Sequence, residues 1–165
     1  MRKEIILTLV ALLGCSSVNL NTKQQSNYGW LEKCVEDYKK SREDPSAMKN
    51  SPRECTDLIE VLITARLQDE YKKLKDSFTF NIAMFYAKAT TTFGSINLSD
   101  SCRNFKGEYL TGIEKYRGEL TQQLRREEVI IEGLRKNREY KKAKTNLFGR
   151  LDSLQNEAQT HECPN

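Results

Sequence analysis

Residues 102–163 read CRNFKGEYLTGIEKYRGELTQQLRREEVIIEGLRKNREYKKAKTNLFGRLDSLQNEAQTHEC, and this stretch decides the fold class. Its apolar residues recur at helical spacing in two series, first Phe105, Tyr109, Ile113, Tyr116, Leu120, Leu124, Ile131 and Leu134, then Tyr140, Ala143, Leu147, Leu151, Leu154 and Ala158. Proline breaks the interior of a helix, and residues 53–163 contain none. We therefore expect an all-α fold.

The length of this stretch predicts a break within it. One helix over 102–160 would run for about 88 Å at about 1.5 Å per residue. A compact domain of this size has a radius of gyration of only about 14 Å. Gly133 lies almost midway between Cys102 and Cys163, so we expect the chain to fold back near 133–138 into a long antiparallel hairpin. The alternative is a continuous coiled-coil arm that tolerates Gly133.

The residues before this stretch predict two further helices. Apolar residues from Trp30 to Tyr38 favour a short amphipathic helix over 29–41, with its aromatic side chains packed in the core rather than forming a binding patch. Residues 42–52 contain Pro45 and Pro52 and are typical of a loop. A capping box at Ser51-Pro52-Arg53-Glu54 begins a second helix that continues to about residue 93. The predicted domain, 28–165, is a small disulfide-stapled bundle of about four helices.

The five cysteines constrain how these helices are joined. The last four, Cys34, Cys55, Cys102 and Cys163, allow three pairings. A continuous helix would place Cys55 about 55 Å from Cys102, whereas a disulfide needs Cα atoms within about 7 Å. This distance disfavours the pairing Cys55–Cys102. We favour Cys34–Cys55, which would close the proline loop, with Cys102–Cys163, which would close the open end of the hairpin. Metal binding by His161 and Cys163 is the competing hypothesis, but a CxxC motif and a second histidine are missing, so we expect no metal and no cofactor.

The first residues are typical of an export signal. Met1-Arg2-Lys3 is basic, and the apolar run over 5–13 is much shorter than the roughly 20 residues that span a bilayer. Leu12-Leu13-Gly14-Cys15 resembles the lipobox of bacterial lipoproteins. That resemblance implies a signal peptide over 1–14, a lipid on Cys15, and a polar tether that completes the segment 15–27. An ordinary secretory signal, cleaved near Gly14 or Ser17, is the alternative.

Charge and motif content narrow the classes of function. The densest basic segment carries six cations against Glu139 alone, net +5 over ten residues: Arg135, Lys136, Arg138, Lys141, Lys142 and Lys144. Such a segment could attract lipid phosphates, lipopolysaccharide or an acidic protein, but a solvated helix end or turn is the simpler interpretation. The chain has one histidine and no catalytic motif, so we do not expect an enzyme. Export and the lack of interleaved aromatic residues argue against nucleic acid as a partner.

A second resemblance covers about residues 34–120. The spacing Cys55-x₁₁-Leu67-x₃-Tyr71-x₂-Leu74 is similar to the second-cysteine region of the LprI-type lysozyme-inhibitor domain. Further similar features are Cys34, the Gly-Ser turn within 93–96, Cys102 and the segment 116–120. A tryptophan and a cysteine of that family are missing between 75 and 92, and Cys163 lies outside the match. The resemblance implies a small helical module that binds and blocks a cell-wall lytic enzyme.

Together these features predict an exported, lipid-anchored, helical interaction protein without enzymatic activity. The expected location is the cell envelope, with the lipid in the outer membrane and the domain facing the periplasm, because Ser16 resembles the residue that follows the lipidated cysteine in outer-membrane lipoproteins. The expected role is that of a lysozyme inhibitor, an immunity protein or an entry-exclusion factor. The alternative is a structural coiled-coil tether or an assembly factor of an envelope complex.

The lipid anchor is testable by one substitution. In Cys15→Ser the sulfur that would carry the diacylglyceryl group is absent, so the protein should move from the membrane pellet to the soluble periplasmic fraction. Cell fractionation followed by immunoblotting measures the distribution, with Ser17→Ala as the control. Unchanged membrane partitioning of Cys15→Ser would contradict lipidation.

Overall fold

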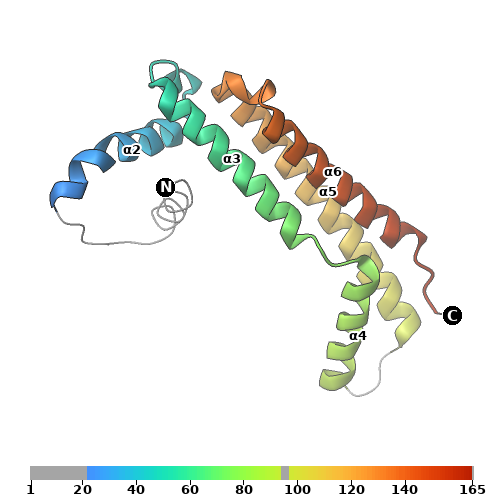
Figure 1. Cartoon of the computed structure of the whole chain (residues 1–165). Coiled ribbons are helices and arrows are strands. Elements are labelled where there is room, and N and C mark those ends of the chain that lie inside the picture. Colours follow the sequence, from blue (N-terminus) through green and yellow to red (C-terminus); the bar gives the residue numbers. More distant parts are fainter. Residues whose placement is uncertain (1–21, 94–96, 165) are drawn as a thin grey trace. The chain divides into compact units, whose positions relative to one another are not determined.

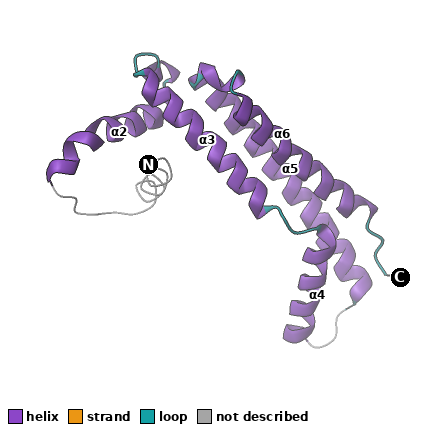
Figure 2. Cartoon of the chain, viewed as in Figure 1, coloured by secondary structure: helices purple, strands orange, loops and turns teal. Residues whose placement is uncertain are grey.

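A computed structural model describes residues 22–93 and 97–164, and these residues form helices and loops without a strand. The expectation of an all-α fold is confirmed, with two disulfides (Figures 1 and 2). The lipobox and Cys15 lie outside the described residues. In chain order the helices are α2 (Thr22–Ser41), the 3₁₀ helix η1 (Pro45–Met48), α3 (Arg53–Lys73), α4 (Phe78–Phe93), α5 (Leu98–Ile130), the 3₁₀ helix η2 (Glu132–Arg135) and α6 (Arg138–Thr160).

The chain divides into two compact units whose boundary falls within α3, between Leu62 and Ile63. In the first unit a disulfide joins Cys34 of α2 to Cys55 of α3, with Cα atoms 5.6 Å apart. This disulfide is one of the two that the sequence predicted. Its buried side chains are Leu31, Cys34, Met48, Cys55 and Ile59.

Two expectations for the first unit need correction. The first helix begins at Thr22 rather than at residue 29, so residues 22–27 of the expected tether are helical. Their lysine and glutamines have good helix propensity, and the segment contains neither glycine nor proline. Trp30 is 51% exposed rather than packed in the core, because the buried face of α2 is the one that carries Leu31 and Cys34.

The start of α3 also differs from the expected capping box. The Ser51 hydroxyl donates to Asp37 Oδ2 at 3.4 Å, and it does not accept the hydrogen bond from the Glu54 amide that a capping box requires. The Pro52 carbonyl instead accepts hydrogen bonds from the amides of Cys55 and Thr56, at 2.9 and 3.3 Å. Pro52 still marks the helix start, because its fixed φ suits a residue that precedes the first turn.

In the second unit the long helical stretch breaks where the sequence predicted. Helix α5 ends at Ile130, η2 follows, and α6 begins at Arg138. Ile131 has extended backbone angles and is fully buried with Leu134, so the turn itself contributes to the core. The Asn137 side chain accepts a hydrogen bond from the Tyr140 amide at 3.0 Å and caps α6. A continuous helical arm over 102–160 is therefore wrong.

Contacts along α5 and α6 show that the two helices run antiparallel (Figure 1). Near the start of α5, Lys106 Nζ donates to two carbonyls at the end of α6, those of Gln159 and His161, each at 2.9 Å. Near the end of α5, Glu128 accepts from Tyr140 and Lys144, in the first turns of α6, at 2.8 and 2.6 Å. The residue number rises along one helix as it falls along the other, as antiparallel packing requires.

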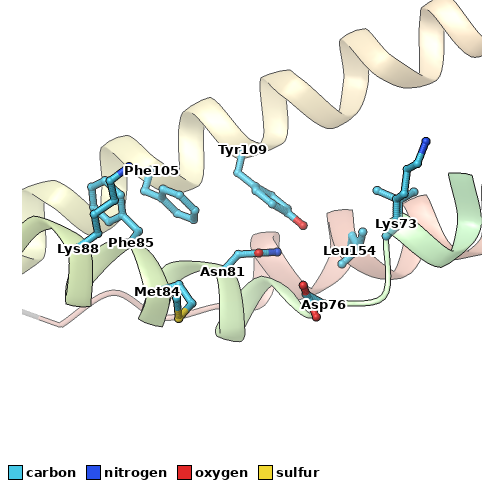
Figure 3. A pocket seen from close by; sticks show the side chains of 10 residues that line it. Lys73, Asp76, Asn81, Met84, Phe85, Lys88, Phe105, Tyr109 and Leu154 are labelled. Carbon is cyan, nitrogen blue, oxygen red and sulfur yellow. The ribbon is translucent and has the colours of Figure 1, made fainter. Parts of the chain in front are cut away.

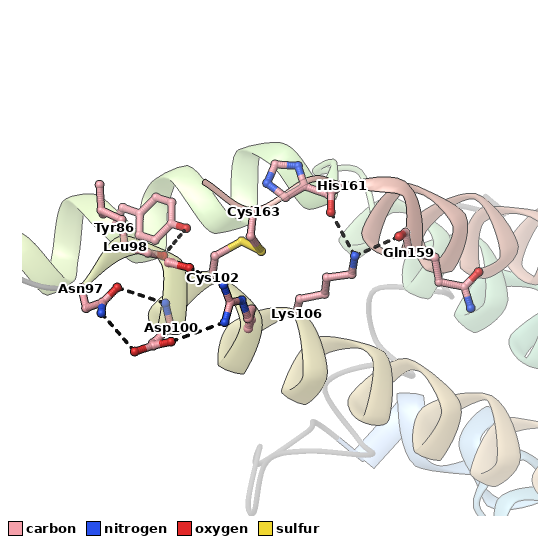
Figure 4. The surroundings of a disulfide bond; sticks show 11 residues. Tyr86, Asn97, Leu98, Asp100, Cys102, Lys106, Gln159, His161 and Cys163 are labelled. Atoms are coloured by element: carbon pink, nitrogen blue, oxygen red, sulfur yellow. Dashed lines mark hydrogen bonds and ion pairs between the residues drawn. A yellow bond between two sulfur atoms is a disulfide. The ribbon is translucent and has the colours of Figure 1, made fainter. Parts of the chain in front are cut away.

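The second disulfide closes the open end of this pair. Cys102, in the first turns of α5, is bonded to Cys163, which follows α6, with Cα atoms 5.7 Å apart (Figure 4). This is the other pairing that the sequence favoured. Cys102 is fully buried in a core cluster with Phe78, Ile82 and Ala158. The disulfide therefore fixes α5 and the end of α6 at the position where α4 packs on them.

The second expected helix does not continue to residue 93, because the chain leaves the helix between Lys73 and Phe78. Arg150 of α6 accounts for this break. Its guanidinium donates to the carbonyls of Leu74, Lys75 and Asp76, at 2.8, 3.2 and 3.1 Å. These carbonyls have no amide partner within a helix. A charged donor stabilises such partly buried carbonyls by supplying the missing hydrogen bonds.

The start of α4 is held from the same helix. Arg150 pairs with Glu157 at 3.1 Å, and Glu157 accepts from the amide of Phe78, the first residue of α4, at 3.0 Å. The Ser77 hydroxyl accepts from the Phe80 amide at 3.1 Å and completes the cap. We call Arg150 and Glu157 the α6 clamp, because the two side chains satisfy the end of α3 and the beginning of α4.

A second polar connection holds the C-terminal half of α3 to α5. The Arg66 guanidinium makes a two-pronged bond to the Glu127 carboxylate, at 2.8 and 2.9 Å, and Glu127 is only 3% exposed. One turn further on, the Tyr116 hydroxyl donates to Glu70 at 2.8 Å. Burial and this bond raise the pKa of Tyr116 to about 12.

Removing the cation of the α6 clamp should destabilise the second unit. Arg150→Met leaves three carbonyls and Glu157 without their charged donor, and a hydrogen bond to a charged group contributes about 1.5–3 kcal/mol. We expect a loss of about 2 kcal/mol in the free energy of unfolding, measured by urea denaturation followed by circular dichroism. Arg103→Met, at an exposed arginine on α5, should change it by less than about 0.5 kcal/mol. Equal losses in the two variants would contradict the role of the clamp.

The anion of the clamp predicts a pH dependence. The Phe78 amide, together with Ser153 and Arg150, holds the pKa of the Glu157 carboxyl below its ordinary value of 4.5 in spite of partial burial. A lowered folded-state pKa stabilises the fold above that ordinary value, and the stabilisation is lost as the pH falls through the folded-state value. The stability gap between the wild type and Glu157→Gln should therefore shrink between about pH 6 and pH 3. A gap that stays constant over this range would refute the assignment.

Candidate functional site

The second unit contains an open groove beside α4, with a volume of about 530 Å³ (Figure 3). The lining residues come from the end of α3, the link to α4, α4 itself, α5 and α6. Its lining residues are Lys73, Leu74, Asp76, Asn81, Met84, Phe85, Lys88, Phe105, Tyr109 and Leu154. We call this feature the α4 groove.

Aromatic rings from α4 and α5 form the wall of the groove. Phe85 stacks on Phe105 with ring centroids 4.8 Å apart, and Tyr109 lies 6.0 Å from Phe105. Behind them, Phe78 is fully buried and makes an edge contact with Tyr109 at 4.9 Å. Burial raises the pKa of the Tyr109 hydroxyl, which points toward Asn81 (Figure 3). The rings are held by packing, so the groove is a preformed apolar surface.

Large apolar side chains on α4 remain open to solvent at the groove. Met84 lines it and is 56% exposed, and Phe80, one turn earlier on the same helix face, is 51% exposed. Lys88 is the only charged residue in the 16 residues of α4. The charged side chains at the rim are Lys73, Asp76 and Lys88. Exposed aromatic and methionine side chains next to a groove are typical of protein-binding surfaces.

Side chains that bind metals are scarce at the groove, whose lining contains Asp76 and no histidine or cysteine. Throughout residues 22–93 and 97–164, no three His, Cys, Asp or Glu side chains lie close enough together to hold a metal ion. Cys163 is in a disulfide and offers no thiolate for a metal or for nucleophilic attack. The His161 ring makes an edge contact with Phe78 at 5.2 Å. The hypothesis of a metal site at His161 and Cys163 is therefore wrong.

The structure divides the predicted basic segment into two groups. Glu128 pairs with Lys144 at 2.6 Å and with Arg135 at 3.4 Å, so these two cations are already neutralised. The other four side chains are exposed: Lys136, Arg138, Lys141 and Lys142. Lys144 and Tyr140 hold the pKa of Glu128 below its ordinary value, although burial acts in the opposite direction.

Sequence reasoning did not find the α4 groove, because it depends on where α3 ends. A single helix to residue 93 would have carried the aromatic residues past α5 without forming a recess. One signal was present in the sequence: Phe78, Phe80, Ile82 and Met84 alternate, so apolar residues occupy more of the helix surface than one buried face requires. Within the described part of the chain, no helix has the length and apolar run that crossing a bilayer demands.

Comparisons with protein-family models, with curated protein sequences and with solved structures found no match to this chain. Its function is therefore inferred from the geometry of the described residues and from the motifs of its sequence.

Proposed function

We propose that this chain is an envelope lipoprotein, anchored through Cys15, whose helical module binds and blocks an envelope-directed protein without enzymatic activity of its own. The lipid would hold it in the outer membrane, facing the periplasm. The single observation that carries the binding role is the α4 groove, with Met84 exposed in its lining and Phe80 exposed one turn away on the same face of α4. Exposure of these apolar side chains to water is unfavourable. Burying one of them against a partner contributes about 1.5–3 kcal/mol to the free energy of binding.

The partner that suits the groove is a protein segment with apolar side chains flanked by at least one carboxylate. The aromatic wall and Met84 provide the apolar contact, and methionine adapts its shape to different side chains. The lining of the groove contains Lys73 and Lys88 with one carboxylate, Asp76, and this net positive charge favours an acidic neighbour on the partner. The pair of Lys73 with Asp69 on its own helix is solvent-exposed, and such a pair is weak enough for a partner carboxylate to compete.

The broken helix supports a compact module over the tether that is the alternative. A tether gains reach from one continuous helix, but here α6 folds back on α5 and a disulfide closes the pair. The proposed bundle of about four helices presents a groove rather than a long arm. An exposed apolar groove has no role in a passive tether, and it would be a liability for aggregation there.

The most concrete form of the proposal is a lysozyme inhibitor. The Cys-Leu-Tyr-Leu spacing over 55–74 resembles the LprI-type inhibitor domain, and the disulfide of Cys34 with Cys55 is compatible with that resemblance. Immunity against a periplasmic toxin and exclusion of an entering phage or plasmid are the other members of the same functional class.

The inhibitor role predicts a stoichiometric effect on muramidase activity. The purified chain should slow lysis of a peptidoglycan suspension by lysozyme at near-equimolar amounts, measured by turbidity. Phe80→Lys with Met84→Lys places one charge in the lining of the α4 groove and one beside it, and should weaken inhibition by about 30-fold or more, as expected for the loss of a binding hot spot. Isothermal titration calorimetry on the same pair of proteins gives the affinity directly.

A matched control separates the groove from a general effect of added charge. Val61 is a comparably exposed apolar residue, at 49%, outside the groove, and Val61→Lys should leave inhibition unchanged. If the wild type has no effect on lysis at about tenfold excess, the lysozyme version is excluded. If the Val61 variant loses inhibition as the groove variant does, the α4 groove is not the binding surface.

A further inference from the structure

The turn between α5 and α6 presents a basic surface on which the exposed cations outnumber the exposed carboxylates of Glu132 and Glu139. We call Lys136, Arg138, Lys141 and Lys142 the basic tip. All four side chains are exposed, and no salt bridge is found for them within the described residues. The last turns of α5 add Arg125 and Arg126, which are also exposed. Glu128 is already engaged by Lys144 and Arg135, so it does not offset these charges.

The position of the basic tip is unfavourable for the stability of the fold. Arg138 and Lys141 lie in the first turn of α6, where the partial positive charge of the helix end favours acidic residues. In the first turn of α6, Glu139 is the one residue with the negative charge that this helix end favours. Like charges that gather at the wrong helix end cost stability, so their occurrence is better explained by an anionic ligand than by folding.

An exposed apolar side chain lies in the last turn of α5, shortly before the basic tip in the sequence. Val129, in the last turn of α5, is 62% exposed, more than any of the other large exposed apolar residues described. It lies next to Arg125 and Arg126 on the outward face of the helix, where it contributes nothing to the core. Cations around a protruding apolar side chain are typical of surfaces that lie in the interface of a membrane.

We propose that the basic tip, with Val129, rests on the anionic phospholipid surface of the membrane. Four flexible cations on a protruding turn suit the diffuse negative charge of a lipid surface, because each Lys or Arg near such a surface gains about the same free energy without a shaped site. An acidic protein would be recognised by a recess or by paired arginines, and the tip is mainly lysine. This proposal rests on one part of the proposed function, the location of the protein in the cell envelope. The lipid on Cys15 would bring the basic tip close to a membrane there.

The contact would strengthen the anchor and limit the orientations of the second unit. An acyl anchor is stabilised by a nearby polybasic surface, and the two contributions to membrane binding act together. The charges of the tip are screened by salt, whereas the acyl chains are not. The two attachments are therefore separable by ionic strength.

The test is the preference of the full chain for anionic over neutral vesicles. The chain with Cys15→Ser is used, so that no acyl chain contributes, and its binding to pure phosphatidylcholine vesicles is compared with binding to vesicles that contain about 30% phosphatidylglycerol. Any contribution of the apolar N-terminal residues is common to both vesicles and cancels in the ratio. Sedimentation at about 0.1 M salt measures both affinities.

The tip variant carries Lys136→Gln, Arg138→Gln, Lys141→Gln and Lys142→Gln, changes that keep helix propensity. We expect its preference for anionic vesicles to fall by about 30-fold or more, and the wild-type preference to disappear at about 0.5 M salt. The matched control removes four exposed lysines elsewhere, Lys33, Lys39, Lys72 and Lys115, and should keep most of the preference. Circular dichroism checks that both variants are folded.

Three results would overturn the proposal. Equal losses in the tip variant and the control would mean that net charge alone drives binding. An unchanged preference in the tip variant would leave an acidic protein as the occupant of the tip. Displacement of the wild type by millimolar glycerol phosphate would mean that single phosphates, and not a lipid surface, are bound. The lysozyme assay contains no lipid, so it tests the proposed function alone. A negative result there is therefore distinct from a negative result in the vesicle assay, which tests membrane binding by the basic tip.

Discussion

The guanidinium of Arg150 is the interaction on which the arrangement of the second unit depends. It donates to three carbonyls where α3 ends and pairs with the carboxylate that receives the first amide of α4. A break in a helix leaves backbone groups without partners, and each would cost free energy if buried unpaired. By satisfying both sides of the break from α6, Arg150 and Glu157 allow α4 to leave the direction of α3. The recess beside α4 follows from that change of direction.

The Cys102–Cys163 disulfide supports the same region from the other side. It lies in the cluster with Phe78, Ile82 and Ala158, so α4, α5 and the end of α6 meet at one covalently closed point. Lys106 strengthens this end by donating to the last carbonyls of α6 (Figure 4). With α4 held by the clamp at its start and by the disulfide cluster along its length, the aromatic wall of the groove is preorganised, which lowers the entropic cost of binding a partner.

Charge has different effects at the two ends of the α5–α6 pair. At the disulfide end the cations are used internally, as Lys106 and Arg150 show. At the turn, one carboxylate engages two cations and leaves four others facing solvent. The basic segment that the sequence presents as uniform is therefore partly structural and partly available to a ligand. Only the side-chain geometry separates Lys144 from Lys142, although the two residues are close in sequence.

The sequence by itself determined the helical class, the break near Gly133 and both disulfides. The helical class and the break follow from apolar periodicity and from the absence of proline, and the disulfides follow from the positions of the cysteines near the ends of the expected helices. The tertiary structure decided where α3 ends, which cations remain free and that an apolar groove exists. Residues 74–77 contain neither proline nor glycine, and the Ser77 cap marks the start of α4 but does not by itself stop helix α3. Its end depends on Arg150, more than 70 residues away, because a long-range partner satisfies the backbone groups that the break leaves unpaired.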